Sequence, residues 1–470
     1  MKTMRARAQQ ALRDQQLQRN LRSTLGKTLT ARDRAVSGVS NWEELRQYAS
    51  DVKTHTLARL SHYLEELESR IIEQGGKVVW ARTPQEAVHF ILDLAHEKDV
   101  RKVVKSKTMV GEEIHLNQAL ERSRIEPIET DLGEFIVQQA GQTPSHIIAP
   151  ALHLSKEEVA RLFVDRVGMA PTRDVEQITA TFRQVMRREF LRAPMGITGV
   201  NFAIAETGTL VVVENEGNAR LTVSAPRIHV AVMGIEKVIP RLADLAVFLK
   251  LLTRSATGQK ITSYVNLING ARRSGERDGP REFYLVLLDN GRSQILEDEF
   301  LRQTLSCIRC GACLNVCPVY QSVGGHAYAS TYQGPIGAIL TPQLEGLEEA
   351  PDPPYASSLC GACYDICPVK IKIPHILLQL RQRVQQRKNA RAARVPLEKL
   401  GMSLWAWAMQ SPENYARTTR WARRLQTLFG RRGGRLTIPF PPFNRWTEKR
   451  SLPRLAPRSF REIHCAKVTK

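Results

Sequence analysis

Seven of the chain's eight cysteines lie between positions 307 and 367, in two runs that each end at a proline. The first run has the spacing C-x2-C-x2-C-x3-C-P and consists of Cys307, Cys310, Cys313 and Cys317. The second run has the shorter spacing C-x2-C-x3-C-P and consists of Cys360, Cys363 and Cys367. Thiolates at the first spacing are typical ligands of bacterial iron–sulfur cubanes. The two runs therefore predict two [4Fe–4S] clusters, whose chemistry is the transfer of single electrons.

The pairing of the two runs predicts which cysteines share a cluster. In two-cluster modules of this kind, the fourth cysteine of a run binds the other cluster. Cluster 1 would then take Cys307, Cys310, Cys313 and Cys367, and cluster 2 would take Cys317, Cys360 and Cys363. Cluster 2 lacks one cysteine, and in register the missing position is Ser357. Three hypotheses stay open: a serine oxygen, water or a partner residue binds the remaining iron; the cluster is [3Fe–4S]; or the open iron has a chemical role.

Structural zinc is the main alternative to iron, because C-x2-C pairs often bind it in tetrahedral sites. Seven cysteines and two Cys-Pro endings exceed what a zinc ribbon requires, so we favour iron. The eighth cysteine, Cys465, stands alone in a basic tail and is expected to be an incidental thiol. His326 and His375 lie near the runs in sequence, where we expect surface or supporting histidines rather than ligands.

Strand and helix patterns alternate through most of the chain before the cysteines. Apolar spacing predicts a helix over residues 41–74, and Thr83-Pro84-Gln85-Glu86 has the residues of a helix start with a capping box. A further helix is expected over residues 241–252 and another after Gly111. Strands are expected, most of them apolar and of parallel type, at residues 78–80, 102–104, 135–137, 147–148, 202–205, 209–213, 229–233 and 283–288.

These patterns divide the chain into four expected regions. They are an N-terminal helical arm over residues 1–69, an α/β domain over 70–292, a cysteine-bearing helical domain over 293–385 and a basic helical region over 386–470. In the last region, basic helices are expected over 376–394 and 397–428, before a Pro-rich tail from Pro439.

Charge is concentrated at the C-terminal end of a chain whose formal net charge is +21. Residues 391–470 hold 18 Lys and Arg against 4 Glu, a net +14, with Trp405, Trp407, Trp421 and Trp446 among them. This segment is expected to dock on partner subunits or on a membrane surface. No nucleic-acid-binding motif is present, so we do not expect nucleic acid as a partner. No apolar run is long enough to span a membrane and no secretory signal is evident, which favours the cytoplasm.

Several phrases resemble the iron–sulfur lactate-utilisation (LUD) family along almost the whole chain. In the α/β region they are Lys105–Lys107, Glu129–Glu134, Pro144–Ile147 and Glu206–Thr209. Ser357–Cys363 resembles the family's second cluster motif, so the missing cysteine is the family's usual arrangement, and Arg458–Arg461 resembles its C-terminal region. The resemblance implies a LUD domain similar to NagB/RpiA/CoA-transferase-like folds, followed by a ferredoxin-type two-cluster domain. It further implies an electron-transfer subunit that acts with two partner proteins in oxidising L-lactate to pyruvate.

Two other functions stay open: electron transfer for another 2-hydroxy acid such as glycolate, and a binding or assembly protein whose clusters are structural. Oxidation of a 2-hydroxy acid needs a cation for the carboxylate and a base for the hydroxyl proton. Candidate groups in the α/β region are Arg220 and Lys105 as cations, His146, His153 and His229 as bases, and an acidic set of Glu129, Asp131, Glu134 and Glu206. Each also has a structural interpretation, as a helix cap or a hydrogen-bonded core residue. No P-loop or strand-linked G-x-G-x-x-G is present, so a self-sufficient dehydrogenase is not expected.

Overall fold

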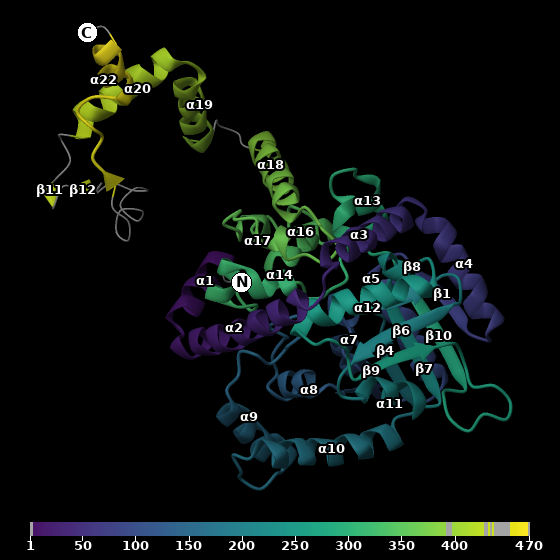
Figure 1. Cartoon of the computed structure of the whole chain (residues 1–470). Coiled ribbons are helices and arrows are strands. Elements are labelled where there is room, and N and C mark those ends of the chain that lie inside the picture. The colour runs from purple at the N-terminus through teal and green to yellow at the C-terminus, as the bar shows by residue number, and fades with distance from the viewer. Residues whose placement is uncertain (1–2, 392–396, 427–430, 433–434, 437–451, 469–470) are drawn as a thin grey trace. The chain divides into compact units, whose positions relative to one another are not determined.

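A computed structural model describes residues 3–391, 397–426, 431–432, 435–436 and 452–468 of the chain. The chain divides into two compact units, Met1–Val384 and Gln385–Lys470 (Figure 1). Within the described residues, no helix is both long enough and apolar enough to cross a membrane.

A six-stranded parallel sheet is the centre of the first unit. In the order in which they pair, its strands are β1 (Lys77–Ala81), β10 (Glu282–Leu288), β7 (Ile228–Gly234), β4 (Met195–Gly199), β2 (Lys102–Lys105) and β3 (Glu126–Glu129). In β10, Tyr284 and Val286 pack into the apolar core on one face, and Phe283 and Leu285 pack into the core on the other. Strands buried on both faces carry continuous apolar runs, which is why β7 and β10 were recognisable in the sequence.

The strand order reverses direction once inside this sheet. From β1 the chain crosses to β2 and continues outward to β3, and then returns through β4, β7 and β10 toward β1. The carboxyl ends of β2 and β4 therefore flank a switch point, the place where ligands bind in open parallel sheets.

A second, smaller sheet lies in the same unit. Its strands, in pairing order, are β8 (Val238–Ile239), β5 (Phe202–Ile204), β6 (Thr209–Glu214) and β9 (Tyr264–Ile268). β5 pairs parallel with β8, but β6 pairs antiparallel with both β5 and β9, so the expectation of parallel strands holds for the main sheet and only in part here.

Helices cover both faces of the main sheet (Figure 1). They are α5 (Pro84–Glu97), α6 (Met109–Glu113), α7 (Leu116–Arg122), α8 (Leu132–Gln139), α9 (Lys156–Leu162), α10 (Val175–Arg192) and α11 (Asn218–Ser224). Helix α12 (Leu242–Thr257) instead shares an apolar core with the smaller sheet. Thr83 caps α5 as predicted, since its side chain accepts from the Glu86 amide. The predicted capping box is altered, because the Glu86 carboxylate accepts from the Arg82 amide at 2.7 Å instead of from Thr83.

The N-terminal arm consists of four helices that pack onto the rest of the unit. They are α1 (Met4–Arg13), α2 (Gln15–Ser37), α3 (Trp42–Ala58) and α4 (Leu60–Glu73). Leu21 and Leu25 of α2 are buried in the same apolar core as the cysteines, whereas Leu64 and Leu67 of α4 pack against β10. The arm is therefore part of the wall that encloses the cysteine site.

The cysteine segment is built from short helices. They are α13 (Arg292–Glu297), α14 (Ala312–Val316), α15 (Pro318–Val323), α16 (Gly334–Leu344) and α17 (Ala362–Asp365), and the segment ends in α18 (Ile373–Arg391). Their buried side chains share one core with α2, α3 and α12.

Three sequence predictions about local structure in the first unit were wrong. Residues 41–74 form two helices rather than one, because the backbone turns at Arg59 (φ −128°, ψ 31°). Residues 135–137 lie in helix α8 and not in a strand, since Asp131 caps the helix by accepting from the Glu134 amide. Ile147 and Ile148 lie in a bend. The backbone amides of Ile148 and Ala149 donate to Nδ1 of His146 and are therefore not available to pair with a neighbouring strand.

The second unit contains α19 (Leu397–Gln410), α20 (Pro412–Leu425), α22 (Phe460–Val468) and three two-residue strands, β11 (Arg431–Arg432), β12 (Arg435–Leu436) and β13 (Leu452–Pro453). The helix predicted over 397–428 is divided at Ser411, which caps α20 ahead of Pro412. The start of the predicted Pro-rich tail at Pro439, and Trp446, lie outside the described residues, as does the side chain of Cys465.

Candidate iron–sulfur site

The first cysteine run forms a tight loop that turns most of its cysteine side chains toward the core. Arg309 and Gly311 both have left-handed backbone conformations, with φ of 60° and 74°. Helix α14 then carries Cys313, and Pro318 begins α15 directly after Cys317. Cys310, Cys313 and Cys317 are buried as a result.

The second run repeats this loop fifty positions later. Leu359 and Gly361 have φ of 57° and 89°, and α17 carries Cys363. In the first run, the Arg309 amide donates to Cys307 Sγ at 3.4 Å. In the second, the Leu359 amide donates to Ser357 Oγ at 3.1 Å. The serine oxygen therefore has the same place in its loop as the Cys307 sulfur has in the first.

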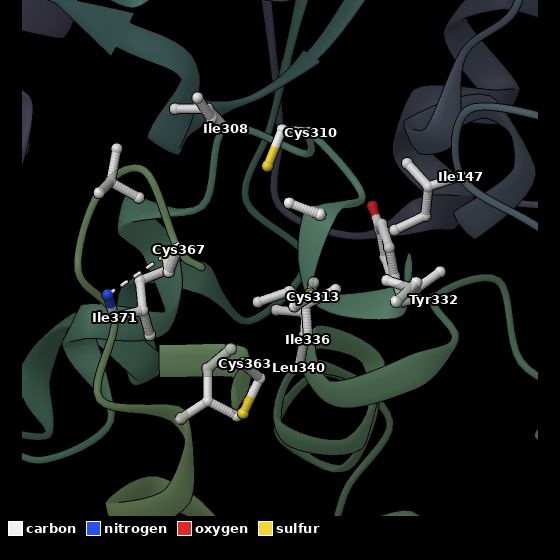
Figure 2. Close-up of a cluster of buried hydrophobic side chains, with 14 of the residues drawn as sticks. Ile147, Ile308, Cys310, Cys313, Tyr332, Ile336, Leu340, Cys363, Cys367 and Ile371 are labelled. Atoms are coloured by element: carbon white, nitrogen blue, oxygen red, sulfur yellow. Dashed lines mark hydrogen bonds between the residues drawn. The ribbon is translucent and has the colours of Figure 1, made fainter. Parts of the chain in front are cut away.

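The thiols fall into two neighbouring groups. Burial raises the pKa of Cys313 well above its usual value, and the nearby thiols of Cys307, Cys310, Cys367 and Cys363 raise it further. Burial, followed by the thiols of Cys317 and Cys360, raises the pKa of Cys363 to about 12. Figure 2 shows Cys310, Cys313, Cys363 and Cys367 among apolar side chains of the core. Thiols so placed ionise when a metal compensates their charge.

Backbone amides point at the sulfurs and favour their thiolate form. Besides the Arg309 contact, the Ile371 amide donates to Cys367 Sγ at 3.4 Å (Figure 2). Amides of Val319 and Tyr320 lower the pKa of Cys317, although burial raises it more strongly. Hydrogen bonds to ligand sulfurs are among the factors that set the potential of an iron–sulfur cluster. This donor set fits such clusters.

The N-terminal arm also reaches the site. Nε and Nη2 of Arg46, on α3, donate to the Cys367 carbonyl at 3.0 and 2.8 Å. This contact fixes the loop that follows Cys367 to the arm. The two histidines considered from the sequence lie elsewhere: His326 donates to the Thr143 carbonyl at 2.7 Å, and His375 is exposed.

Among the described residues, no three His, Cys, Asp or Glu side chains lie close enough together to share one metal ion. A tetrahedral zinc site needs four sulfurs about 2.3 Å from a single ion. A cubane makes no such demand, because each of its cysteines binds a different iron.

A buried ion network joins the cysteine loop to the main sheet. Arg292 is fully buried and donates to Glu236 at 2.6 Å and to both carboxylate oxygens of Glu113 at 2.8 Å. Arg309, between two cysteines, donates to the other Glu236 oxygen at 3.1 Å. Burial alone would raise the pKa of Glu236, but Arg292 and Arg309 outweigh it and lower that pKa to about 2. Both arginines therefore face an ionised carboxylate.

Neither of the two candidate cations, Lys105 and Arg220, is placed to bind a ligand carboxylate at the switch point. Lys105 is buried and pairs with Glu129 at 2.7 Å and with Glu112 at 3.2 Å. Arg220 is exposed and lines a separate cavity beside β9. The structure brings Glu129, Asp131 and Glu134 together near Lys105 and Lys107, whereas the Glu206 carboxylate accepts from the Leu242 amide at the start of α12.

The three candidate histidines are held in structural hydrogen bonds. His146 Nδ1 accepts from the amides of Ile148 and Ala149, so its Nε2 donates to Asn315 at 3.0 Å. Burial lowers the pKa of His146 and of His153 to about 4 and that of His229 to about 3. His153 forms hydrogen bonds with the side chains of Ser145 and Gln142, and His229 Nε2 forms one with the Thr198 hydroxyl inside the sheet. These contacts support their structural interpretation.

A cavity of about 420 Å³ lies at the switch point of the main sheet. Ser106 and Lys107 follow β2, Asn201 follows β4, and Lys237 follows β7 among the residues that line it. Arg309 contributes to it from the cysteine loop. Sequence reasoning missed Lys237 and Arg309, although Glu236-Lys237 inside the apolar stretch 235–239 and an arginine between two cysteines were visible signals.

Three family models match successive parts of the chain. They are described as LUD domain (residues 64–288), 4Fe-4S dicluster domain (303–371) and Lactate utilisation protein B, C-terminal (379–467). The sequence is 44% identical to Lactate utilization protein B of Bacillus licheniformis over 443 residues, which cover 94% of this chain and 92% of that protein. It is 44% identical to Lactate utilization protein B of Shouchella clausii over 457 residues, covering 97% and 95%. A solved DUF162 family protein from Deinococcus radiodurans aligns with a TM-score of 0.27 at 14% identity, covering 49% of this chain and 98% of that one.

Proposed function

The chain belongs to the lactate utilization protein B family, and we propose that it carries electrons between partner proteins during oxidation of L-lactate to pyruvate. Its role in lactate utilization and its iron–sulfur domain follow from the relatives and from the dicluster match. The observation that carries the electron-transfer proposal is that five buried cysteines share one core, with Cys307 packed against it, and that backbone amides donate to the sulfurs of Cys307 and Cys367. When bound, an iron–sulfur cluster accepts and donates electrons.

We propose two [4Fe–4S] clusters with crossed ligand sets. Cluster 1 would be held by Cys307, Cys310, Cys313 and Cys367, and cluster 2 by Cys317, Cys360 and Cys363. The proximity of the thiols supports this division. Cys307, Cys310 and Cys367 lie near enough to Cys313 to raise its pKa, and Cys317 and Cys360 lie near enough to Cys363 to raise its pKa. Cys313 also lies near Cys363, which brings the two sets side by side.

Partner docking is proposed for the second unit. Several of its large apolar side chains are exposed, among them Trp405 (57%), Trp421 (64%) and Met402 (58%). They occur in a segment with a net +14, which suits a partner protein whose surface is acidic and apolar. Interfaces are enriched in Trp, Met and Arg, as this unit is.

Lactate-dependent reduction tests the proposed function. Anaerobically purified chain is mixed with its two partner proteins and L-lactate, and cluster reduction is followed by the loss of visible absorption. We expect reduction with L-lactate only when the partners are present. Reduction by glycolate in preference to L-lactate would move the assignment to another 2-hydroxy acid. Clusters that dithionite cannot reduce would instead indicate a structural role.

Ser357 is proposed as the oxygen ligand of cluster 2, because Oγ occupies the loop position of Cys307 Sγ. Ser357→Ala should make cluster 2 lose one of its four irons under mild oxidation and increase the [3Fe–4S] electron paramagnetic resonance signal severalfold. Ser357→Cys should suppress that signal below the wild-type level.

The neighbouring Ser358→Ala serves as the matched control, since Ser358 is exposed. Equal [3Fe–4S] signals in wild type and Ser357→Ala would show that another group binds the fourth iron.

A further inference from the structure

We propose that the 420 Å³ cavity at the switch point binds a small carboxylate that carries a hydroxyl or oxo group on the adjacent carbon. This proposal rests on the proposed function for its choice of ligand class, but the site itself is argued from the fold. The cavity opens where the chain leaves β2 and where it leaves β4, the two strands at which the order reverses. In open parallel sheets, ligands occupy this position.

The cavity is lined by three basic side chains, Lys107, Lys237 and Arg309, and by three carboxylates, Asp131, Glu214 and Glu216. The basic side chains have polar atoms with no hydrogen-bond partner among the described residues. Lys237 is 8% exposed, and its Nζ forms no hydrogen bond or ion pair with any described residue. Arg309 is 6% exposed, and its Nε and Nη1 have no hydrogen-bond partner, although Nη2 reaches Glu236. Lys107 Nζ lies 3.1 Å from Glu134 but without hydrogen-bond geometry.

The surroundings of Lys237 are also cationic. Four buried cations, Lys53, Lys237, Arg292 and Arg309, share two carboxylates, Glu113 and Glu236. Arg292 and Arg309 pair with these carboxylates, and Lys53 donates to the backbone carbonyls of Glu236 and Val238. Lys237 is the member of this set without an acceptor among the described residues, and a buried ammonium without a partner is costly, so an anion in the cavity would stabilise its charged form. The sulfur of Cys307, a proposed cluster ligand, also lies near Lys237 and Arg309. Binding affinity and cluster spectra, measured on the same variants, distinguish an interaction of these side chains with the cluster from an interaction with a bound ligand.

A second unpaired polar group lies in the same cavity. The hydroxyl of Ser106 is 2% exposed and has no hydrogen-bond partner. It directly follows Lys105 at the end of β2, where it lines the cavity together with Lys107. Cations suit the carboxylate of a ligand, and an unpaired hydroxyl suits an oxygen on the adjacent carbon. Small-molecule sites typically combine an enclosed space of this size with a few such convergent polar groups.

Isothermal titration of the oxidised, cluster-loaded full chain tests the site without partner proteins. The ligands are L-lactate, pyruvate, propionate and inorganic phosphate. We expect L-lactate or pyruvate to bind at least about tenfold more tightly than propionate, which lacks the second oxygen. Lys237→Met should weaken that binding at least about tenfold, or about 1.4 kcal/mol. Lys250→Met, on the exposed face of α12, should leave it unchanged.

Ser106→Ala provides a variant that keeps the fold. Because the Ser106 hydroxyl has no partner in the protein, its removal should not lower the thermal unfolding temperature, but it should weaken L-lactate or pyruvate binding severalfold. Ser255→Ala is the matched control, since Ser255 is also buried with an unpaired hydroxyl but lies outside the cavity.

Four outcomes would overturn the site: no carboxylate binding by the wild type, phosphate binding as tight as that of L-lactate, unchanged affinity in Ser106→Ala, or a Lys237→Met variant with altered cluster spectra and unaltered affinity. The last would assign Lys237 to the cluster alone. Because binding is measured without electron transfer, irreducible clusters would contradict the proposed function and leave the site intact.

Discussion

Replacement of Cys313 by serine is expected to remove cluster 1 and about half of the chain's iron. Cys313 is buried in the shared core, and the three other proposed ligands of cluster 1 lie near enough to its thiol to raise its pKa. A serine hydroxyl ionises much less readily than a thiol, and its shorter bond to Cβ places the oxygen farther from the iron than the Cys313 sulfur, so serine should not hold the iron at this buried position. The measurement is iron and sulfide content per chain after anaerobic purification, together with the electron paramagnetic resonance spectrum of the reduced protein, which should lose the magnetic coupling between two clusters.

Cys465→Ser is the matched control for this experiment, since Cys465 is the single cysteine outside the two runs. It should retain full iron content. If Cys313→Ser kept its full iron content, or if both clusters vanished in Cys465→Ser, the proposed ligand sets would be incorrect.

Replacement of Arg292 by methionine is expected to destabilise the first unit by about 3–5 kcal/mol, the cost of removing one partner from a buried ion pair. Arg292 makes bonds of 2.6–2.8 Å to two carboxylates, and it is fully buried. Its loss leaves Glu113 without its arginine partner and leaves Glu236 paired with Arg309 alone. Chemical denaturation, followed by circular dichroism under anaerobic conditions, measures this effect.

Arg281→Met is the control, because Arg281 is an exposed residue beside β10 and its replacement should change stability by no more than about 0.5 kcal/mol. We also expect Arg292→Met to weaken the attachment of the cysteine loop to the main sheet, since Glu236 joins Arg292 to Arg309. Equal stability of Arg292→Met and Arg281→Met would show that the network contributes little.

The sequence predicted those parts of the site and the fold whose geometry depends on residues close to one another in the chain. The cysteine spacing indicated iron–sulfur chemistry because the loop Cys307–Cys313 is short and its geometry is local. Parallel strands such as β10 were predicted because burial on both faces leaves a continuous apolar run. Helix α8 was mistaken for a strand because three apolar residues in succession fit both, and the Asp131 cap decided between them.

The cavity could not be predicted, because its residues come together only through the topology. Lys237 and Arg309 are about seventy residues apart in the chain, with α12, β9 and β10 between them, and only the strand order places them at one edge. Lys105 shows the opposite case: it begins a family-like phrase and was a candidate to bind a carboxylate ligand, yet in the folded chain it pairs with Glu129 and Glu112. Pairing partners of buried charges depend on long-range contacts that spacing does not reveal.

Two reducible [4Fe–4S] clusters in this chain are the basis of the proposed electron transfer. Electron paramagnetic resonance, with iron and sulfide counts, on anaerobically purified protein before and after dithionite tests for them. We expect about eight irons per chain, four for each cluster, and two magnetically coupled signals on reduction. Zinc in place of iron, or clusters that never reduce, would contradict the proposed electron transfer.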